Sequence, residues 1–186
     1  MKLALLRHGE AEASEKRLYC GSTDLPLSEK GREKLEAARG AYPDVSSMRV
    51  ITSGMRRCEE TLRIIYGDIP HERIKDLREV DFGAFEMRSY EELKSDPAYV
   101  SWITGDNEKN VPPFGESGEH MKKRVLKALS AILRGGRDAL VVTHGGSAAV
   151  ILEALFPEKG QNRYELQPPP GGGYLIDVDA HTLEKI

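Results

Sequence analysis

Two histidines occupy equivalent places in the sequence, each at the end of a short apolar segment. His8 lies in residues 7–10 (RHGE) and follows the run 2–6, whereas His144 follows the run 138–143. In open α/β sheets, ligands bind beyond the carboxyl ends of the strands, so neighbouring strands would bring both imidazoles to one crevice. Glycine next to each histidine lets backbone amides approach an oxyanion closely. These residues, with the adjacent cation of Arg7, predict a phosphate-binding site.

Two alternatives compete with this interpretation. A single histidine at a strand end is most often a capping residue, but two matched occurrences favour a shared site. Histidine is also a common zinc ligand, yet Arg7 places a cation where a metal would need neutral or anionic ligands. The pair Cys20 and Cys58 has no zinc-type spacing and is too small for a disulfide framework, so we expect reduced thiols. We therefore favour phosphate over metal.

The elements that must position these residues alternate between strand and helix. Short apolar runs predict strands at 2–6, 48–52, 73–75, 138–143, 174–178 and 182–186. Helical spacing of apolar residues predicts helices at 28–41, 53–66, 121–133 and 147–156. Residues 77–85 show no clean period and suggest a functional loop, and 168–173 suggest a rigid turn. The alternation predicts a three-layer α/β/α sandwich with a mostly parallel central sheet and helices on both faces.

Length and composition are those of a globular protein. The 186 residues suit a single domain spanning 1–186, with 39% hydrophobic and 31% charged residues. No apolar run is long enough to span a bilayer, and 1–6 meets Arg7 and His8 too soon for a signal-peptide core. The formal net charge of −3, with scattered basic residues, gives no general attraction for nucleic acid. We expect a cytoplasmic protein whose partner is a small phosphorylated metabolite, and which is a monomer or a homodimer.

Five segments in order along the chain resemble the motifs of the histidine phosphatase superfamily. They are 5–10 (LLRHGE), 24–28 (DLPLS), 53–61 (SGMRRCEET), 79–86 (EVDFGAFE) and 142–146 (VTHGG). Arg-His-Gly alone is weak evidence, but five ordered segments that cover nearly the whole chain are specific. Within the family, residues 85–88 (FEMR) and the chain length most resemble the α-ribazole phosphatases.

The resemblance implies a role for each matching residue. His8 is the expected nucleophile that becomes phosphohistidine, while its second ring nitrogen donates a hydrogen bond that sets the tautomer. Arg7 and Arg57 are expected to bind phosphoryl oxygens, as guanidinium groups do bidentately. His144 is expected to stabilise charge on these oxygens. Glu79 is expected to protonate the leaving alkoxide and later to deprotonate water.

Further residues are candidates for phosphate binding, for the acid or for the lining of the pocket. The backbone amide of Gly145 is a further candidate phosphate ligand, and Asp81 is the alternative acid. Ser14 stands where the family usually has asparagine, so it is a candidate phosphate contact with a shorter side chain. The pocket-lining candidates are Cys20 and Gly21, with Cys20 more often filler there than a nucleophile.

The resemblance implies hydrolysis without cofactor or metal. Phosphoglycerate mutases share the motifs but have longer segments that exclude water, whereas residues 79–144 are compact here, which favours a phosphatase. A mutase-like phosphotransferase and a catalytically silent phospho-ligand binding module are the alternatives. Trp102, Tyr99 and Phe114 could wall a pocket for a ring-bearing substrate such as α-ribazole 5'-phosphate, or pack elsewhere.

Overall fold

A computed structural model describes residues 1–106, 108–159 and 163–186, and within them one six-stranded sheet has the order β3-β2-β4-β1-β5-β6. The strands are β1 (Lys2–Arg7), β2 (Arg49–Thr52), β3 (Glu72–Arg73), β4 (Ala139–Thr143), β5 (Gly173–Asp177) and β6 (Thr182–Lys185). Neighbours from β3 to β1 are parallel, and β5 and β6 add antiparallel pairs at one edge. The prediction of a mostly parallel sheet with two closing strands is confirmed.

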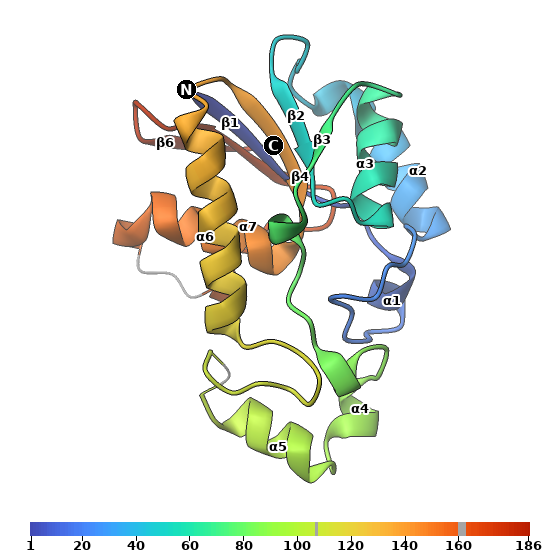
Figure 1. The fold of residues 1–186 in the computed structure, drawn as a ribbon. Helices are drawn as coiled ribbons and strands as arrows, with labels where there is room; N and C mark the ends of the chain where they lie inside the picture. The colour runs from blue at the N-terminus through green and yellow to red at the C-terminus, as the bar shows by residue number, and fades with distance from the viewer. Residues whose placement is uncertain (107, 160–162) are drawn as a thin grey trace.

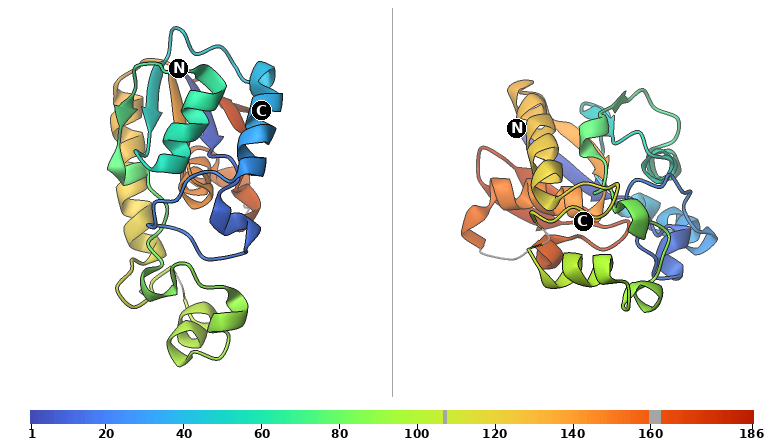
Figure 2. Two further views of the ribbon diagram at one scale, coloured as in Figure 1. Left: turned by 90° about the vertical axis from the view of Figure 1, so that its right-hand side faces the viewer. Right: turned by 60° about the horizontal axis from the view of Figure 1, so that its bottom comes forward.

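Alternation along the central strands creates the layers. On β1, Leu3 and Leu5 pack in one core with helices α6 (Gly118–Arg134) and α7 (Gly145–Leu155). Ala4 and Leu6 pack in another core with α2 (Glu29–Ala38) and α3 (Arg56–Tyr66). Successive side chains of a strand point to opposite faces, so a strand buried on both faces needs apolar residues throughout. Figure 2 shows α6 and α2 on opposite sides of the sheet. The predicted three-layer sandwich is confirmed.

Capping residues explain where several of the main helices begin and end. They are α2 (Glu29–Ala38), α3 (Arg56–Tyr66), α6 (Gly118–Arg134) and α7 (Gly145–Leu155). Ser28 caps α2 by accepting from the Gly31 amide, and Gly67 ends α3 with a φ of 82° that favours glycine. The predicted start of α6 was three residues late, because Ser117 accepts from the amide of His120 and starts the helix at Gly118. α7 likewise starts directly after His144, two residues earlier than predicted.

Smaller elements complete the chain. They are α1 (Glu12–Glu15), α4 (Tyr90–Leu93), α5 (Pro97–Thr104) and α8 (Arg163–Leu166), with 3-10 turns at Arg39–Ala41, Lys75–Leu77, Gly83–Phe85 and Pro157–Lys159. The predicted strand 73–75 is displaced, since β3 pairs at 72–73 and Lys75 already starts a 3-10 turn. Among the described helices, none is long and apolar enough to cross a membrane.

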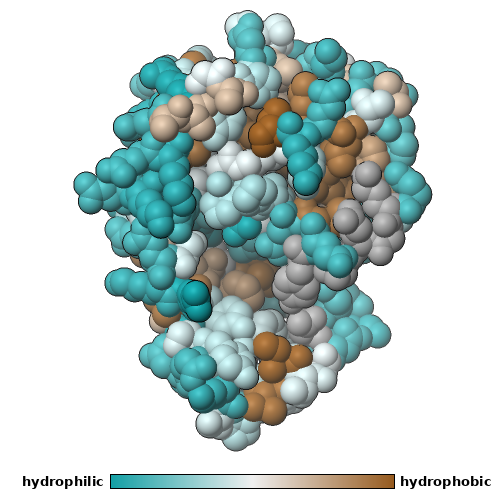
Figure 3. Space-filling view, turned by 180° about the vertical axis from the view of Figure 1, so that it is seen from behind, coloured by the Kyte–Doolittle hydropathy of each residue, from teal (hydrophilic) through white to brown (hydrophobic). Residues whose placement is uncertain are grey.

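The sequence did not predict α4 and α5, which lie together beyond one end of the sheet (Figure 1). Phe85, Leu93 and Tyr99 form a separate small core there, packed against partly buried Tyr19, Phe82 and Trp102. Seen from behind, the surface is hollowed between this lower part and the body, with hydrophobic side chains at the base of the hollow (Figure 3). The segment that contains α4 and α5 therefore borders the hollow at this end of the sheet.

Replacing Leu5 with alanine tests the central core. Leu5 is fully buried between the sheet and its helices, so L5A should lower the free energy of unfolding by about 2–5 kcal/mol. Urea unfolding followed by circular dichroism measures this change. V111A is the control, because Val111 is exposed and its truncation should stay within about 0.5 kcal/mol of the parent. Equal effects of the two changes would contradict this account of the core.

Candidate active site

Parallel pairing of β1 and β4 brings the two strand-end histidines together. Arg7 pairs with Thr143, and the amide of His8 donates to the Thr143 carbonyl at 2.9 Å. The rings of His8 and His144 meet edge to face with centroids 5.0 Å apart. Both imidazoles are buried, with 7% and 0% of their surface exposed. The two imidazoles therefore lie side by side at the strand ends, as the sequence predicted for neighbouring strands.

The hydrogen bonds of His8 determine its tautomer. Nδ1 lies 2.7 Å from the carbonyl oxygen of Gly9, an acceptor, so Nδ1 carries the proton. Nε2 then presents a lone pair, which accepts from Nε of Arg57 at 3.2 Å. Burial, and then the charge of Arg57, lower the pKa of His8 well below its ordinary value. His8 is thus a neutral imidazole with an unprotonated nitrogen aimed at a cation, the state that a nucleophile requires.

Arg57 is a buried cation held by neutral groups. Its side chain is 1% exposed, and Nε also donates to Nδ1 of His144 at 3.2 Å. Nη1 donates to the Thr23 carbonyl at 2.9 Å and Nη2 to the Gly21 carbonyl at 2.7 Å. Within the described residues, the hydrogen-bond partners of this guanidinium are therefore all neutral. A buried charge without a counter-charge is costly, so an anion bound beside it would be strongly favoured.

His144 is positioned at the start of a helix. Its carbonyl accepts the first bond of α7 from Ala148, and its ring Nε2 lies 2.9 Å from Oγ of Ser53. Burial, followed by the charge of Arg57, lowers the pKa of His144 well below its usual value, and the positive end of the helix dipole acts in the same direction. Cys58 lies 3.6 Å from Nε2, and burial raises the pKa of its thiol to about 12. Cys58 therefore stays a protonated packing residue.

Arg7 and Glu79 line one cavity of about 510 Å³. Nη1 of Arg7 donates to the Pro168 carbonyl at 2.9 Å, whereas Nε is buried and has no hydrogen-bond partner among the described residues. Burial lowers the pKa of Arg7, an effect opposed by the negative charge of Glu79. Oε2 of Glu79 accepts from the Gly146 amide at 2.8 Å. Arg7 and the oriented carboxylate of Glu79 thus line the same cavity.

Glycines permit this close assembly. A Cβ on Gly145 would lie 3.0 Å from Cζ of Arg7 and 2.6 Å from Oε1 of Gln167. A Cβ on Gly146 would lie 2.4 Å from Oε1 of Glu79. Our sequence prediction selected the amide of Gly145 but missed that of Gly146, although the double glycine after His144 marks it. It also missed Gln167, which lines the cavity but belongs to none of the matched motifs.

Other candidate residues are distributed unevenly around the cavity. Ser14 is exposed on α1, where its neighbours Ala11 and Ala13 take the buried positions, and it is not a lining residue of the cavity. Cys20 lines the cavity, and burial raises the pKa of its thiol. Gly21 is buried behind the lining, and a Cβ there would lie 1.6 Å from the Val80 carbonyl oxygen. The structure therefore brings Cys20 to the cavity and does not bring Ser14 there.

Asp81, the alternative acid, is not a lining residue of the cavity, and the three candidate aromatic residues differ in whether they line it. The carboxylate of Asp81 accepts hydrogen bonds from Oγ of Ser22 and from the Gly83 amide, both at 2.8 Å. These bonds connect the loop around Ser22 to the turn at Gly83. Trp102 lines the cavity, Tyr99 is fully buried in the small core, and Phe114 is 95% exposed. Of these three aromatic residues, Trp102 alone lines the cavity that contains Arg7 and Glu79.

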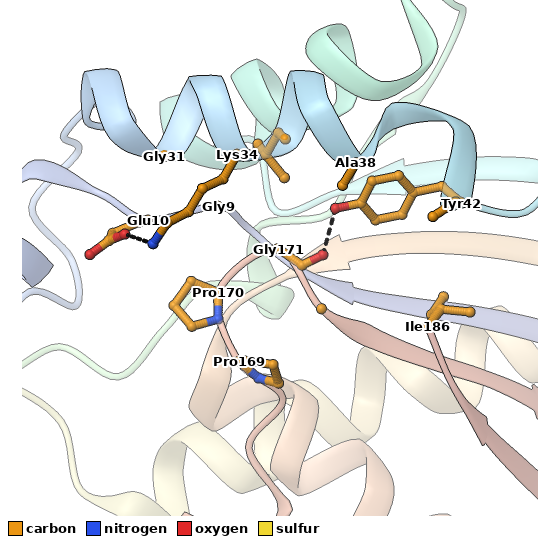
Figure 4. A pocket seen from close by; sticks show the side chains of 13 residues that line it. Gly9, Glu10, Gly31, Lys34, Ala38, Tyr42, Pro169, Pro170, Gly171 and Ile186 are labelled. Carbon is orange, nitrogen blue, oxygen red and sulfur yellow. Dashed lines mark hydrogen bonds and ion pairs between the residues drawn. The ribbon is translucent and has the colours of Figure 1, made fainter.

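A second hollow, of about 480 Å³, lies on the other side of the turn 168–172 (Figure 4). The Tyr42 hydroxyl donates to the Gly171 carbonyl at 2.7 Å there, and the amide of Gly171 donates to the carbonyl of His8 at 3.0 Å. Glu10 and Lys34 form an ion pair of 2.7 Å at its rim. Neither Arg7 nor Glu79 lines this hollow, so it is separate from the cavity of the candidate site.

An α/β sandwich that places neutral imidazoles, one buried arginine and one partly buried arginine at the ends of adjacent parallel strands has a site suited to a phosphate-like anion. The chain belongs to the histidine phosphatase superfamily (branch 1), whose sequence model matches residues 3–184. This finding confirms the family resemblance.

Similar proteins include both phosphatases and mutases. The adenosylcobalamin/α-ribazole phosphatase of Salmonella typhimurium is 29% identical over 96% of this chain and 91% of its own length. The 2,3-bisphosphoglycerate-dependent phosphoglycerate mutase of Xanthobacter autotrophicus is 30% identical over 98% and 95%. The α-ribazole phosphatase structure from Shigella flexneri has a TM-score of 0.86, with 26% identity over 98% of this chain and 93% of that one.

The two buried histidines should make stability depend on pH. Their pKa values are lowered in the folded state, so the unfolded chain takes up protons first as the pH falls below about 6.5. The free energy of unfolding should therefore drop by about 2 kcal/mol between pH 6.5 and 5.5 from these two groups. Urea unfolding at several pH values measures it. His144→Gln should lose about half of that dependence, and an unchanged slope in this variant would contradict the assignment.

Proposed function

We propose that this chain is a phosphomonoester hydrolase that acts through a phosphohistidine on His8, with α-ribazole 5'-phosphate or a similar small phosphate ester as substrate. The observation that carries the proposal is the His8 ring, whose Nδ1 is bound to the Gly9 carbonyl while Nε2 faces Arg57. The free Nε of Arg7 and the uncompensated charge of Arg57 support phosphate as the bound anion.

In the first half-reaction, Nε2 of His8 attacks phosphorus and the ester P–O bond breaks. In the free enzyme, the Nε–H group of Arg57 donates a hydrogen bond to the lone pair of Nε2. When this lone pair forms the P–N bond, the same Nε–H group donates its hydrogen bond to a phosphoryl oxygen instead. Arg7 stabilises another oxygen, and His144 contributes a hydrogen bond once the phosphate dianion beside it favours a proton on Nδ1. The electron pair of the broken bond leaves on the alkoxide, which takes the proton that Glu79 carries once the phosphate dianion lies beside it.

In the second half-reaction, water attacks the phosphohistidine and Glu79, now a carboxylate, accepts the proton of that water. The P–N bond breaks, its electron pair returns to Nε2, and phosphate leaves. The Gly146 amide keeps Glu79 at the edge of the cavity through both steps. One carboxyl group can serve both half-reactions because the second needs the protonation state that the first leaves behind.

The cavity walls support a substrate with a flat ring. Tyr19, Phe82 and Trp102 line the space next to Arg7 and Glu79. Tyr19 and Phe82 pack edge to face with Trp102, so the wall is rigid as well as apolar. Aromatic walls favour a planar ring on the leaving group, which suits a nucleoside-like phosphate better than a phosphoglycerate.

The proposed nucleophile is tested with p-nitrophenyl phosphate. Turnover should persist in EDTA and fall by about 10³-fold or more in His8→Asn, because the covalent step is lost. His181→Asn is the matched control, since His181 is exposed and its ring contacts Glu158 at the surface. Absence of turnover in the parent protein would favour a binding module, EDTA sensitivity would indicate a metal site, and faster transfer between phosphoglycerates than hydrolysis would favour a mutase.

The aromatic wall is tested by comparing two substrates. Trp102→Ala should raise the KM for α-ribazole 5'-phosphate by about 10-fold and leave the KM for glycerol phosphate nearly unchanged. Phe114→Ala is the control, because Phe114 is 95% exposed and outside the cavity lining. An equal change of KM for both substrates would argue against a ring-binding role for Trp102.

A further inference from the structure

The carboxylate of Glu86 is surrounded by hydrogen-bond donors from two segments of the chain. Oε1 accepts from the amides of Gly21 at 3.0 Å, Ser22 at 2.9 Å and Phe82 at 3.0 Å. Oε2 accepts from the amide of Thr23 at 3.2 Å and from its hydroxyl at 2.7 Å. Successive backbone amides that converge on an anion form a nest, which a negative charge stabilises. Glu86 therefore anchors the loop 21–23 from one side.

The other side of the same loop holds Arg57. While the amides of Gly21 and Thr23 point to Glu86, the carbonyls of these two residues accept from Nη2 and Nη1 of Arg57. The short loop thus lies between an anion and a buried cation. The peptide group between Gly21 and Ser22 is held by both charges, because its carbonyl accepts from Arg57 and its amide donates to Glu86. The loop has little freedom to adjust, since Gly21 is in close contact with the Val80 carbonyl.

From Arg57 the connection continues to the reacting atoms, because its Nε donates to Nε2 of His8 and to Nδ1 of His144. We propose that Glu86 is a positioning residue that acts through the loop 21–23 to hold the Arg57 guanidinium in register with His8. The inference rests on the proposed phosphatase function. It assigns a role to a residue that is not itself a lining residue of the cavity and is not a hydrogen-bond partner of His8 in the described structure.

The charge of Glu86 is what the nest requires. Both carboxylate oxygens face donors, so glutamine in the same place would turn its NH₂ group towards N–H or O–H groups and leave donors unpaired. The loop would then lose its anchor without any change of side-chain volume. Its two carbonyls would no longer hold Arg57 in one position.

Glu92 provides a matched control. Its carboxylate also accepts bonds from a backbone amide and a hydroxyl, both of Ser89 and both at 2.7 Å, in the capping box of α4. Those bonds fix the start of a surface helix and have no connection to Arg57. Glu92→Gln therefore removes a comparable local anchor but should leave the reaction unchanged.

The experiment compares Glu86→Gln and Glu92→Gln with the parent enzyme. We measure kcat and KM for p-nitrophenyl phosphate, the inhibition constant of inorganic phosphate, and thermal unfolding. In Glu86→Gln, kcat/KM should fall by about 10- to 100-fold, because small misplacements of a positioning group have effects of this size. The phosphate inhibition constant should rise with it, and Glu92→Gln should stay within about twofold of the parent.

A double-mutant cycle then tests whether Glu86 acts through Arg57. In an Arg57→Lys background the forked contacts to Gly21 and Thr23 are absent, so adding Glu86→Gln should change kcat/KM by less than about twofold. A full multiplicative loss in that background would overturn the proposal. Parent-like kinetics of Glu86→Gln in an active enzyme would also overturn it, whereas an inactive parent would refute the proposed function instead.

Thr23→Val covers the case in which Glu86→Gln does not fold. It removes the hydroxyl that donates to Oε2 of Glu86 and keeps the carbonyl that accepts from Arg57. A folded Thr23→Val enzyme should show the same change in smaller degree, roughly fivefold in kcat/KM with a parallel rise of the phosphate inhibition constant. Unchanged kinetics in this variant would overturn the proposal.

Discussion

The site depends on the burial of one guanidinium. Arg57 is 1% exposed and donates to two imidazoles and two backbone carbonyls, so its charge is distributed over neutral acceptors. Loss of water and the nearby cation keep both imidazoles neutral, because each disfavours a second positive charge. This arrangement also leaves a buried positive charge without a counter-ion among the described residues. The same interaction therefore explains why the imidazole of His8 is neutral and why a bound anion would stabilise this part of the structure.

The sheet makes this burial possible. β1 and β4 are adjacent and parallel, and their apolar residues face helical layers on both sides, so their ends are held rigidly. His8 and His144 leave the sheet at this edge, where α7 begins directly after His144. Thr61 of α3 accepts from the Gly9 amide at 3.0 Å and ties the helix that carries Arg57 to the loop that carries His8. Precision at the site thus derives from packed elements and not from flexible loops.

The surroundings of the site come from a different part of the fold. Trp102 belongs to α5, beyond the end of the sheet, and packs with Tyr19 and Phe82 from two other segments. This small aromatic core is separate from the two cores of the sandwich. The proposed phosphate site and the proposed wall for the leaving group therefore belong to different packing units, and relatives of this chain are named both as phosphatases and as mutases.

The sequence by itself determined the sandwich and the family, because apolar runs and glycine-flanked motifs are local patterns that report directly on strands and their ends. The adjacency of the two histidines depended on strand order, which the pairing of β1 with β4 decided. The helix α5 escaped prediction since its stability comes from contacts of Tyr99 and Trp102 with distant aromatic residues. The roles of Gly146 and Gln167, and the outward position of Ser14, likewise required the folded chain. Only tertiary structure decides which side chains face one cavity, because that depends on packing between segments far apart in sequence, which no local pattern records.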